Sequence, residues 1–184
     1  MKRALCAAGL LLGQMPAQAY ELQTLEVSHQ GKAYHVQVQA RLARKPERVF
    51  AVLTEFERAS QLNPSIKSMV VMPEGDALRS VSHTDGCFAG FCRDIFHVQK
   101  LTVRRSAHGG RIDAITEPLE HSDFASGDNH ILVQADGYGA LFSLVSTSVP
   151  SFWLPPLIGP YAVQMRLREE ALNTLSNLER LASE

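Results

Sequence analysis

Residues 160–182 read PYAVQMRLREEALNTLSNLERLA, and this stretch predicts a long amphipathic helix at the end of the chain. Pro160 suits the first turn of a helix, where its missing N–H costs nothing. Apolar side chains then recur at three- and four-residue spacing, which gathers them on one face: Tyr161, Met165, Ala171, Leu172, Leu175, Leu178 and Ala182. We expect this face to pack against the rest of the protein.

Two polar residues fall inside that apolar face when the helix is laid out at about 100° per residue. They are Gln164 and Arg168, and polar groups in such a place need a partner. One interpretation is that they point into a cavity beside Tyr161 and Met165, where Arg168 would bind a carboxylate or phosphate of a ligand. The alternative is that the Arg168 stem crosses the core to reach water or an internal acid.

The segment before the helix, residues 150–160, reads PSFWLPPLIGP and contains four prolines, no charge and the only tryptophan of the chain. Its prolines exclude a helix or an inner strand. Phe152 and Trp153 are predicted to form a gate over a ligand cavity or to touch a membrane transiently, because both side chains suit a membrane interface. The alternative is a stiff connector that closes one end of the fold.

The remaining chain predicts one strand, two short helices and a series of strands. Residues 34–42 alternate apolar and polar, the period of a strand, and residues 22–29 are candidates to pair with them. Helical spacing begins at Pro46, and a second short helix ends before Pro64. Six strand-like runs follow, separated by Gly, Asp and Asn: residues 66–72, 78–84, 91–103, 111–116, 129–135 and 138–149.

This order predicts an α+β fold with a curved antiparallel sheet of about seven strands. Such a sheet curls strongly, and its concave face needs a cover. The terminal helix is the only predicted element long enough to cover it. A sheet wrapped on one helix tends to leave a cavity between them.

The first 19 residues resemble a secretory signal. Lys2 and Arg3 precede an apolar run that is too short to span a bilayer, and Ala17 and Ala19 mark a cleavage site. We therefore expect a single exported domain, residues 20–184, in the periplasm. The chain has a net charge of −1, and loss of the two basic residues makes the remainder more acidic, which argues against a nucleic-acid partner.

Cysteine and histidine content bears on chemistry. Cys6 would leave with the signal, so Cys87 and Cys92 are predicted to form a disulfide; a redox dithiol is the alternative. The seven histidines lack any metal-ligand spacing, so no metal is predicted. His97 and His130 are the catalytic candidates, because a histidine with an acidic partner can abstract a proton; each could equally be an ordinary strand residue. No cofactor motif is found.

Three motifs indicate a family: CFAGFC at residues 87–92, SDF at 122–124 and PPLIGP at 155–160. With the order of elements from Lys32 to Ala182, they make the chain resemble the SRPBCC superfamily, also called START-like or polyketide cyclase/dehydrase-like, and in particular its exported bacterial members. The resemblance implies a helix-grip fold with an apolar ligand cavity. It implies no single reaction and no universal catalytic residue.

The favoured hypothesis is therefore a periplasmic binding or carrier protein for a hydrophobic small molecule or lipid. The alternative is a cyclase/dehydrase-like enzyme that acts on a polyketide-like substrate through His97, His130 or Arg168. A third hypothesis is an accessory protein with a filled core that binds a protein partner. The state of the cavity discriminates among them, and the sequence leaves oligomeric state and ligand identity open.

Overall fold

The computed structural model describes residues 20–88, 91–137 and 139–184. The predicted signal segment, residues 1–19, lies outside the described residues. The elements follow one another as eight strands, a long terminal helix and three short helical segments: β1 (Tyr20–Gln30), β2 (Ala33–Leu42), α1 (Pro46–Thr54), η1 (Phe56–Arg58), α2 (Ala59–Leu62), β3 (Ile66–Glu74), β4 (Ala77–Phe88), β5 (Phe91–Ser106), β6 (Gly109–Thr116), β7 (Phe124–Asp136), β8 (Gly139–Pro150) and α3 (Gly159–Leu181).

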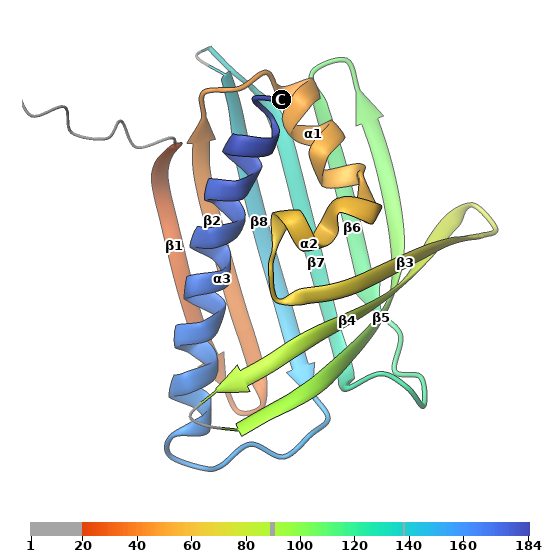
Figure 1. Cartoon of the computed structure of the whole chain (residues 1–184), viewed down its shortest axis with the longest axis vertical. Helices are drawn as coiled ribbons and strands as arrows, with labels where there is room; N and C mark the ends of the chain where they lie inside the picture. Colours follow the sequence, from red (N-terminus) through yellow and green to blue (C-terminus); the bar gives the residue numbers. More distant parts are fainter. Residues whose placement is uncertain (1–19, 89–90, 138) are drawn as a thin grey trace, which may run out of the picture.

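All eight strands belong to one antiparallel sheet in the order β1-β2-β8-β7-β6-β5-β4-β3. The α+β prediction is confirmed, with one strand more than the seven expected, because β1 pairs along its whole length with β2. Figure 1 shows α3 crossing in front of the sheet while β3, β4 and β5 curl round towards it. The prediction of a helix-grip fold is thus confirmed.

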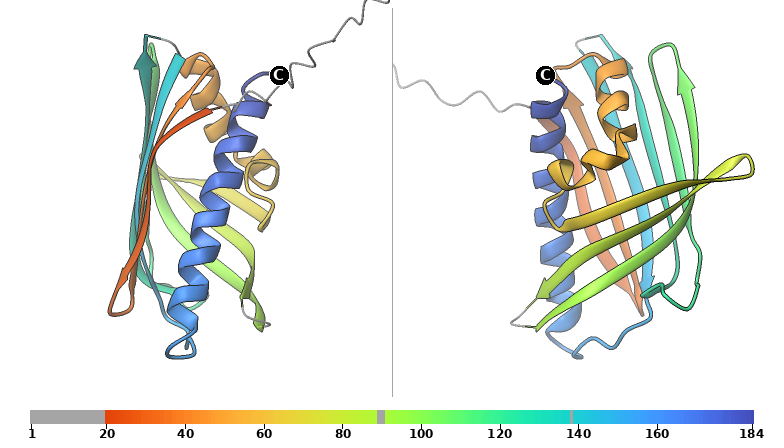
Figure 2. Two further views of the ribbon diagram at one scale, coloured as in Figure 1. Left: turned by 90° about the vertical axis from the view of Figure 1, so that its left-hand side faces the viewer. Right: turned by 45° about the vertical axis from the view of Figure 1, so that its right-hand side comes forward.

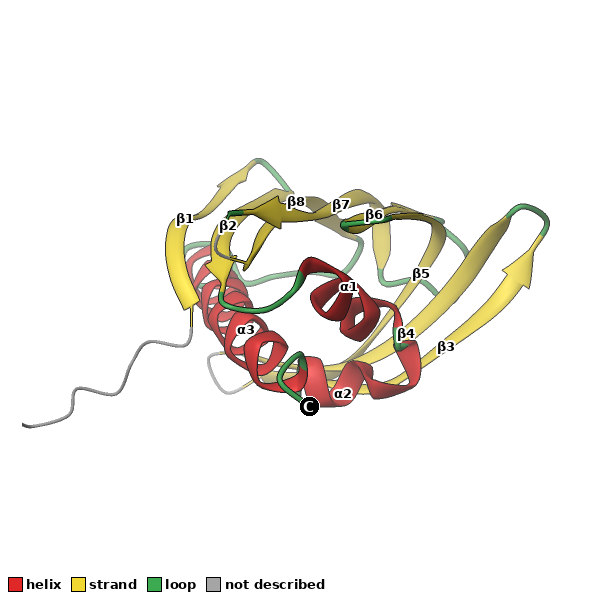
Figure 3. Ribbon diagram, turned by 90° about the horizontal axis from the view of Figure 1, so that it is seen from above, coloured by secondary structure: helices red, strands yellow, loops and turns green. Residues whose placement is uncertain are grey.

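The curled sheet and α3 together surround an interior space. Seen from above, one wall consists of β1, β2, β8, β7 and β6, and the opposite wall consists of β4 and β3 (Figure 3). The helices α3 and α2 close the ring. The side view in Figure 2 shows α3 running along the open side of the sheet. Because α1 lies inside this ring at one end only, the two ends of the interior are filled differently.

The α1 end holds the hydrophobic core. Phe50 of α1 is almost fully buried, together with Leu175, Leu178 and Leu181 from the last turns of α3. Gly110 is required at this end, because a Cβ there would overlap the Phe50 ring.

Among the described residues no helix has both the length and the apolar character to span a membrane.

The predicted apolar face of α3 is right for its last three turns and wrong for its first ones. Tyr161 and Met165 were expected on the packed face, yet they are 65% and 55% exposed. Val163 and Leu167 face the interior instead. The reason is that apolar residues lie on both sides of the early turns, so the choice of side depends on where the sheet lies and not on spacing alone.

Candidate ligand cavity

A cavity of about 250 Å³ lies between the first turns of α3, the concave face of the sheet and the hairpin end where β4 finishes and β5 begins. It continues inward, because Ser82, Thr84, His97 and Asn129 line both this space and the adjoining one. A still deeper region extends beneath α1 and α2, where Leu53, Leu101, Ile112, Ile131 and Leu144 supply an apolar lining. The interior at this end of the grip is therefore open, which disfavours the filled-core hypothesis.

The open part of the cavity is lined by hydroxyl, amide and imidazole groups that face one another across the sheet. Antiparallel register places Ser82 of β4 beside His97 of β5, and Asn129 of β7 beside Ser146 of β8. Ser148 lies two residues further along β8, on the same face. Uncharged polar groups thus form a belt across the chamber, whose lining also includes apolar side chains and the charged residues Asp85, Arg166 and Glu170. We call this set the polar belt: Ser82, Thr84, His97, Asn129, Ser146 and Ser148.

His97 lies in the polar belt, so one of the two predicted catalytic histidines is in the cavity. Its Nε2 is 2.7 Å from the Thr116 hydroxyl, and its ring lies 4.2 Å from the Phe124 ring centroid. Burial lowers the pKa of His97 from 6.5 to about 4, because the charged form would lose its hydration. Among the described residues no carboxylate pairs with it, so it is held as a neutral imidazole.

His130, the other predicted catalytic residue, does not line the cavity. Ile131 packs against the core, so its neighbour His130 points to the opposite, convex face of β7. There its two nitrogens lie 2.7 Å from Asp113 and 3.1 Å from Asp128. Of the two catalytic candidates, His130 therefore lies away from the cavity. No cluster of three or more metal-ligating side chains occurs within the described residues.

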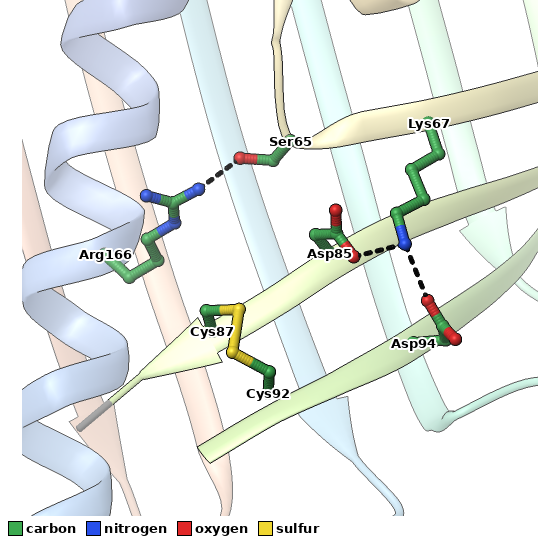
Figure 4. The surroundings of a disulfide bond; sticks show 7 residues. All are labelled: Ser65, Lys67, Asp85, Cys87, Cys92, Asp94 and Arg166. Atoms are coloured by element: carbon green, nitrogen blue, oxygen red, sulfur yellow. Dashed lines mark hydrogen bonds and ion pairs between the residues drawn. A yellow bond between two sulfur atoms is a disulfide. The ribbon is translucent and has the colours of Figure 1, made fainter. Parts of the chain in front are cut away.

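The arginine at the cavity is Arg166, and the sequence analysis missed it. Arg166 donates to Glu170, about one turn further along α3, at 2.9 Å, and to the Ser65 hydroxyl at 2.5 Å. Figure 4 shows its side chain reaching from α3 towards Ser65 across the interior. Arg168, the predicted ligand-binding residue, is exposed and contacts the Leu25 carbonyl of β1 instead. The correction follows from the helix phase, since residues 166 and 168 lie roughly 200° apart on a helix.

The other residues predicted for the helix face also lie outside the cavity. Gln164 is held on the β1 side of α3, where its amide is 3.2 Å from His29 Nδ1 and bonds the Pro160 carbonyl. Tyr161 and Met165 are solvent-exposed, as described above. Sequence reasoning also missed Glu170, Tyr34 and every member of the polar belt except His97. The two-residue period of β8 could have found two of them, because it places Ser146 and Ser148 on the face of the buried Phe142.

The mouth of the cavity combines the disulfide with an aromatic cluster. Cys87 and Cys92 are bonded to each other, as predicted, and their Cα atoms are 4.1 Å apart. This bond joins β4 to β5 where both strands end, and Lys67 beside it bridges Asp85 and Asp94 (Figure 4). The bond therefore fixes the separation of the two strand ends that border the opening.

Phe152 was predicted to bind ligand, and it does line the mouth. Its ring meets Phe124 edge-on at 6.4 Å between centroids and lies 4.3 Å from the Arg93 guanidinium. Arg93 also donates to Asp123 at 2.5 Å, which leaves its charge paired. Trp153, by contrast, is 74% exposed and borders a separate groove outside the mouth.

Trp153 is one of five large apolar side chains that are exposed between residues 153 and 165. Leu157 and Ile158 follow in the same loop, at 96% and 55% exposure, and Tyr161 and Met165 lie on the first turns of α3. Monomeric proteins seldom leave such a set of large apolar groups in water without a use for it. We call these five residues the apolar loop patch.

No protein-family model and no curated protein sequence matches the chain. Solved structures do match it. The Zhui aromatase/cyclase of a Streptomyces species is similar with a TM-score of 0.65 and 13% identity, over 82% of this chain and 94% of that chain. A STAR-related lipid transfer protein of Xanthomonas axonopodis is similar with a TM-score of 0.64 and 12% identity, over 87% of this chain and 99% of that chain. A Thermus thermophilus protein is similar with a TM-score of 0.64 and 18% identity, over 81% of this chain and 97% of that chain.

These similarities extend over most of each chain. The similar structures include both a lipid transfer protein and an aromatase/cyclase. At 8–18% identity they establish architecture and not activity. What this chain shares with them is therefore the overall arrangement of its sheet and helices. This chain has the helix-grip fold of the SRPBCC, or START-like, superfamily.

Proposed function

We propose that this chain is a periplasmic carrier that holds a hydrophobic small molecule or lipid between α3 and the sheet. The observation that carries the proposal is the open interior, with an apolar inner lining and a neutral polar belt. Ligand sites are commonly concave, largely apolar and equipped with a few polar groups that orient the ligand. The periplasmic location rests on the signal-like residues 1–19 and on the Cys87–Cys92 bond, which an oxidising compartment would preserve.

Transient contact with a membrane through residues 150–160 forms part of this proposal. Trp153 of the apolar loop patch borders a groove that shares Phe152 with the mouth of the cavity. Trp153 and Tyr161 are the residue types that favour the interface between lipid and water. An apolar ligand that passed directly from a bilayer to the mouth would avoid exposure to water. The loop would then act as the gate that the sequence suggested, with Phe152 at the opening and Trp153 in the interface.

A carrier is favoured over a cyclase/dehydrase-like enzyme by the state of His97. A general base works best with a pKa near the operating pH, and the pKa of about 4 makes His97 a weak base at neutral pH. The acidic partner that the enzyme hypothesis requires is missing from the described surroundings of His97. His130 has acidic partners but lies on the convex face.

Native mass spectrometry of protein purified from the periplasm of an exporting host tests the carrier function. We expect a fraction of the molecules to carry an added apolar mass, which organic extraction removes. The extracted protein should then take up an environment-sensitive apolar dye. Protein that never carries such a mass and binds no dye would contradict the proposal.

Tryptophan fluorescence tests the membrane contact, since the chain has one tryptophan. Vesicles of phosphatidylethanolamine and phosphatidylglycerol should shift the Trp153 emission to shorter wavelength and shield it from acrylamide. Leu157→Ser is the matched variant, because Leu157 is almost fully exposed and its replacement leaves the core intact. The variant should respond less to vesicles at unchanged thermal stability, and an emission that ignores vesicles would rule out the contact.

A further inference from the structure

The charged groups that line the cavity are already paired with one another. Arg166 is bonded to Glu170 and Ser65, and Asp85 is 2.5 Å from Lys67. At the mouth, Arg93 is bound to Asp123. A carboxylate or phosphate brought into the interior would have to displace one of these partners, and the displaced group would then be left without its counter-charge. Among the described lining residues no cation is left over for an anionic head group.

A donor with no partner lies deeper in the same cavity. Gln99 is 9% exposed, and its Nε2 is buried without any hydrogen-bond partner. It lines the inner region together with Leu101, Ile112 and Ile131, and it lies two residues along β5 from His97 on the same face. A buried amide N–H without an acceptor is strongly unfavourable, so its position in the lining calls for an acceptor that the cavity itself receives.

The groups between the mouth and Gln99 are neutral donors and acceptors. Ser82, Asn129 and Ser146 of the polar belt supply hydroxyls and an amide. His97 adds an imidazole that burial keeps uncharged at neutral pH. Such groups stabilise carbonyl, hydroxyl or ether oxygens and give little compensation for a desolvated full charge.

We infer that the cavity selects an uncharged, mostly apolar molecule that carries a carbonyl or ether oxygen at its buried end, and that Gln99 donates a hydrogen bond to this oxygen. The inference rests on the carrier function proposed above and specifies its ligand class. It replaces the expectation of an anionic head group on Arg168. The pairing of the charged lining residues disfavours an anionic ligand. The unpartnered Gln99 amide supplies a hydrogen-bond donor for a neutral oxygen of the ligand.

Displacement of an apolar dye by three probes of equal chain length tests the inference. The probes are dodecanoate, the corresponding methyl ketone and the corresponding alkane, applied to delipidated full-length mature protein at neutral pH. We expect the ketone to bind about tenfold more tightly than both dodecanoate and the alkane. Dodecanoate that binds as tightly as the ketone would overturn the inference while leaving the carrier function standing.

Gln99→Leu should weaken ketone binding about five- to tenfold and leave alkane binding unchanged, because it removes only the buried donor. Gln37→Leu is the matched control: Gln37 is exposed on the opposite face of β2, so this variant should bind all three probes like the original chain. Equal ketone affinity in both variants would overturn the role of Gln99. If no probe displaces the dye from any variant, the proposed carrier function fails as well.

Discussion

Replacing His97 by Gln should remove a specific part of the acid sensitivity of this protein. Gln keeps a side chain of similar length that can bond the Thr116 hydroxyl, but it does not titrate. In the folded chain, burial lowers the pKa of His97 to about 4, whereas an unfolded histidine has a pKa near 6.5. The unfolded state therefore binds a proton at a pH where the folded state does not.

The sign and size of the effect follow from linkage. Above about pH 6.5 neither state is protonated at His97, so the residue contributes no pH dependence there. As the pH falls from 6.5 towards 4, the free energy of unfolding decreases, because protons stabilise only the unfolded chain. The loss reaches about 2 kcal/mol at pH 5 and about 3 kcal/mol at pH 4, at roughly 1.4 kcal/mol per pKa unit.

Urea unfolding of delipidated protein, followed by circular dichroism between pH 7.5 and 5, measures this loss. Other groups also titrate in this range, so the informative quantity is the difference between the original chain and His97→Gln. The variant should lose about 2 kcal/mol less than the original chain between the two pH values. His121→Gln, on an exposed loop, controls for the replacement of a histidine by glutamine outside the cavity. Equal losses in the original chain and His97→Gln would refute the buried, neutral state of His97.

Three further predictions concern the mouth and the core. Trp153→Ala should lower the free energy of unfolding by less than about 1 kcal/mol because Trp153 is exposed. Phe50→Ala should lower it by about 3–5 kcal/mol because Phe50 is buried. Similar losses for the two variants in urea unfolding would contradict this prediction. Gly110→Ala should cost about 1–3 kcal/mol, since its Cβ would overlap the Phe50 ring, and an unchanged melting temperature would speak against that contact. Denatured, unreduced exported protein should bind no maleimide, and two labels per chain would disprove the Cys87–Cys92 bond.

The sequence predicted most elements because their signals are local. The alternation in residues 34–42 and the helical spacing from Pro46 each depend on neighbours within a few positions. Which side chains face the cavity depends instead on segments that are far away in the sequence. Arg166 and Arg168 are both arginines on one helix, and only the position of β4 and Ser65 decides which of them faces the interior. For the same reason, spacing placed His97 and His130 on strands without showing that they lie on opposite faces of the sheet.

Side-chain size along β8 explains why the cavity lies at one end of the grip. Near α1, the large Phe142 of β8 fills the space beneath α3, where Leu175 and Leu178 pack against the core. Towards the other end, β8 presents Ser146 and Ser148, which are too short to reach α3. The early turns of the helix therefore face an unfilled space. Arg166 and Glu170 are tolerated there because they pair with each other, and Arg166 also bonds Ser65 across the space. The decrease in side-chain volume along one strand thus sets both the place of the cavity and its polar character.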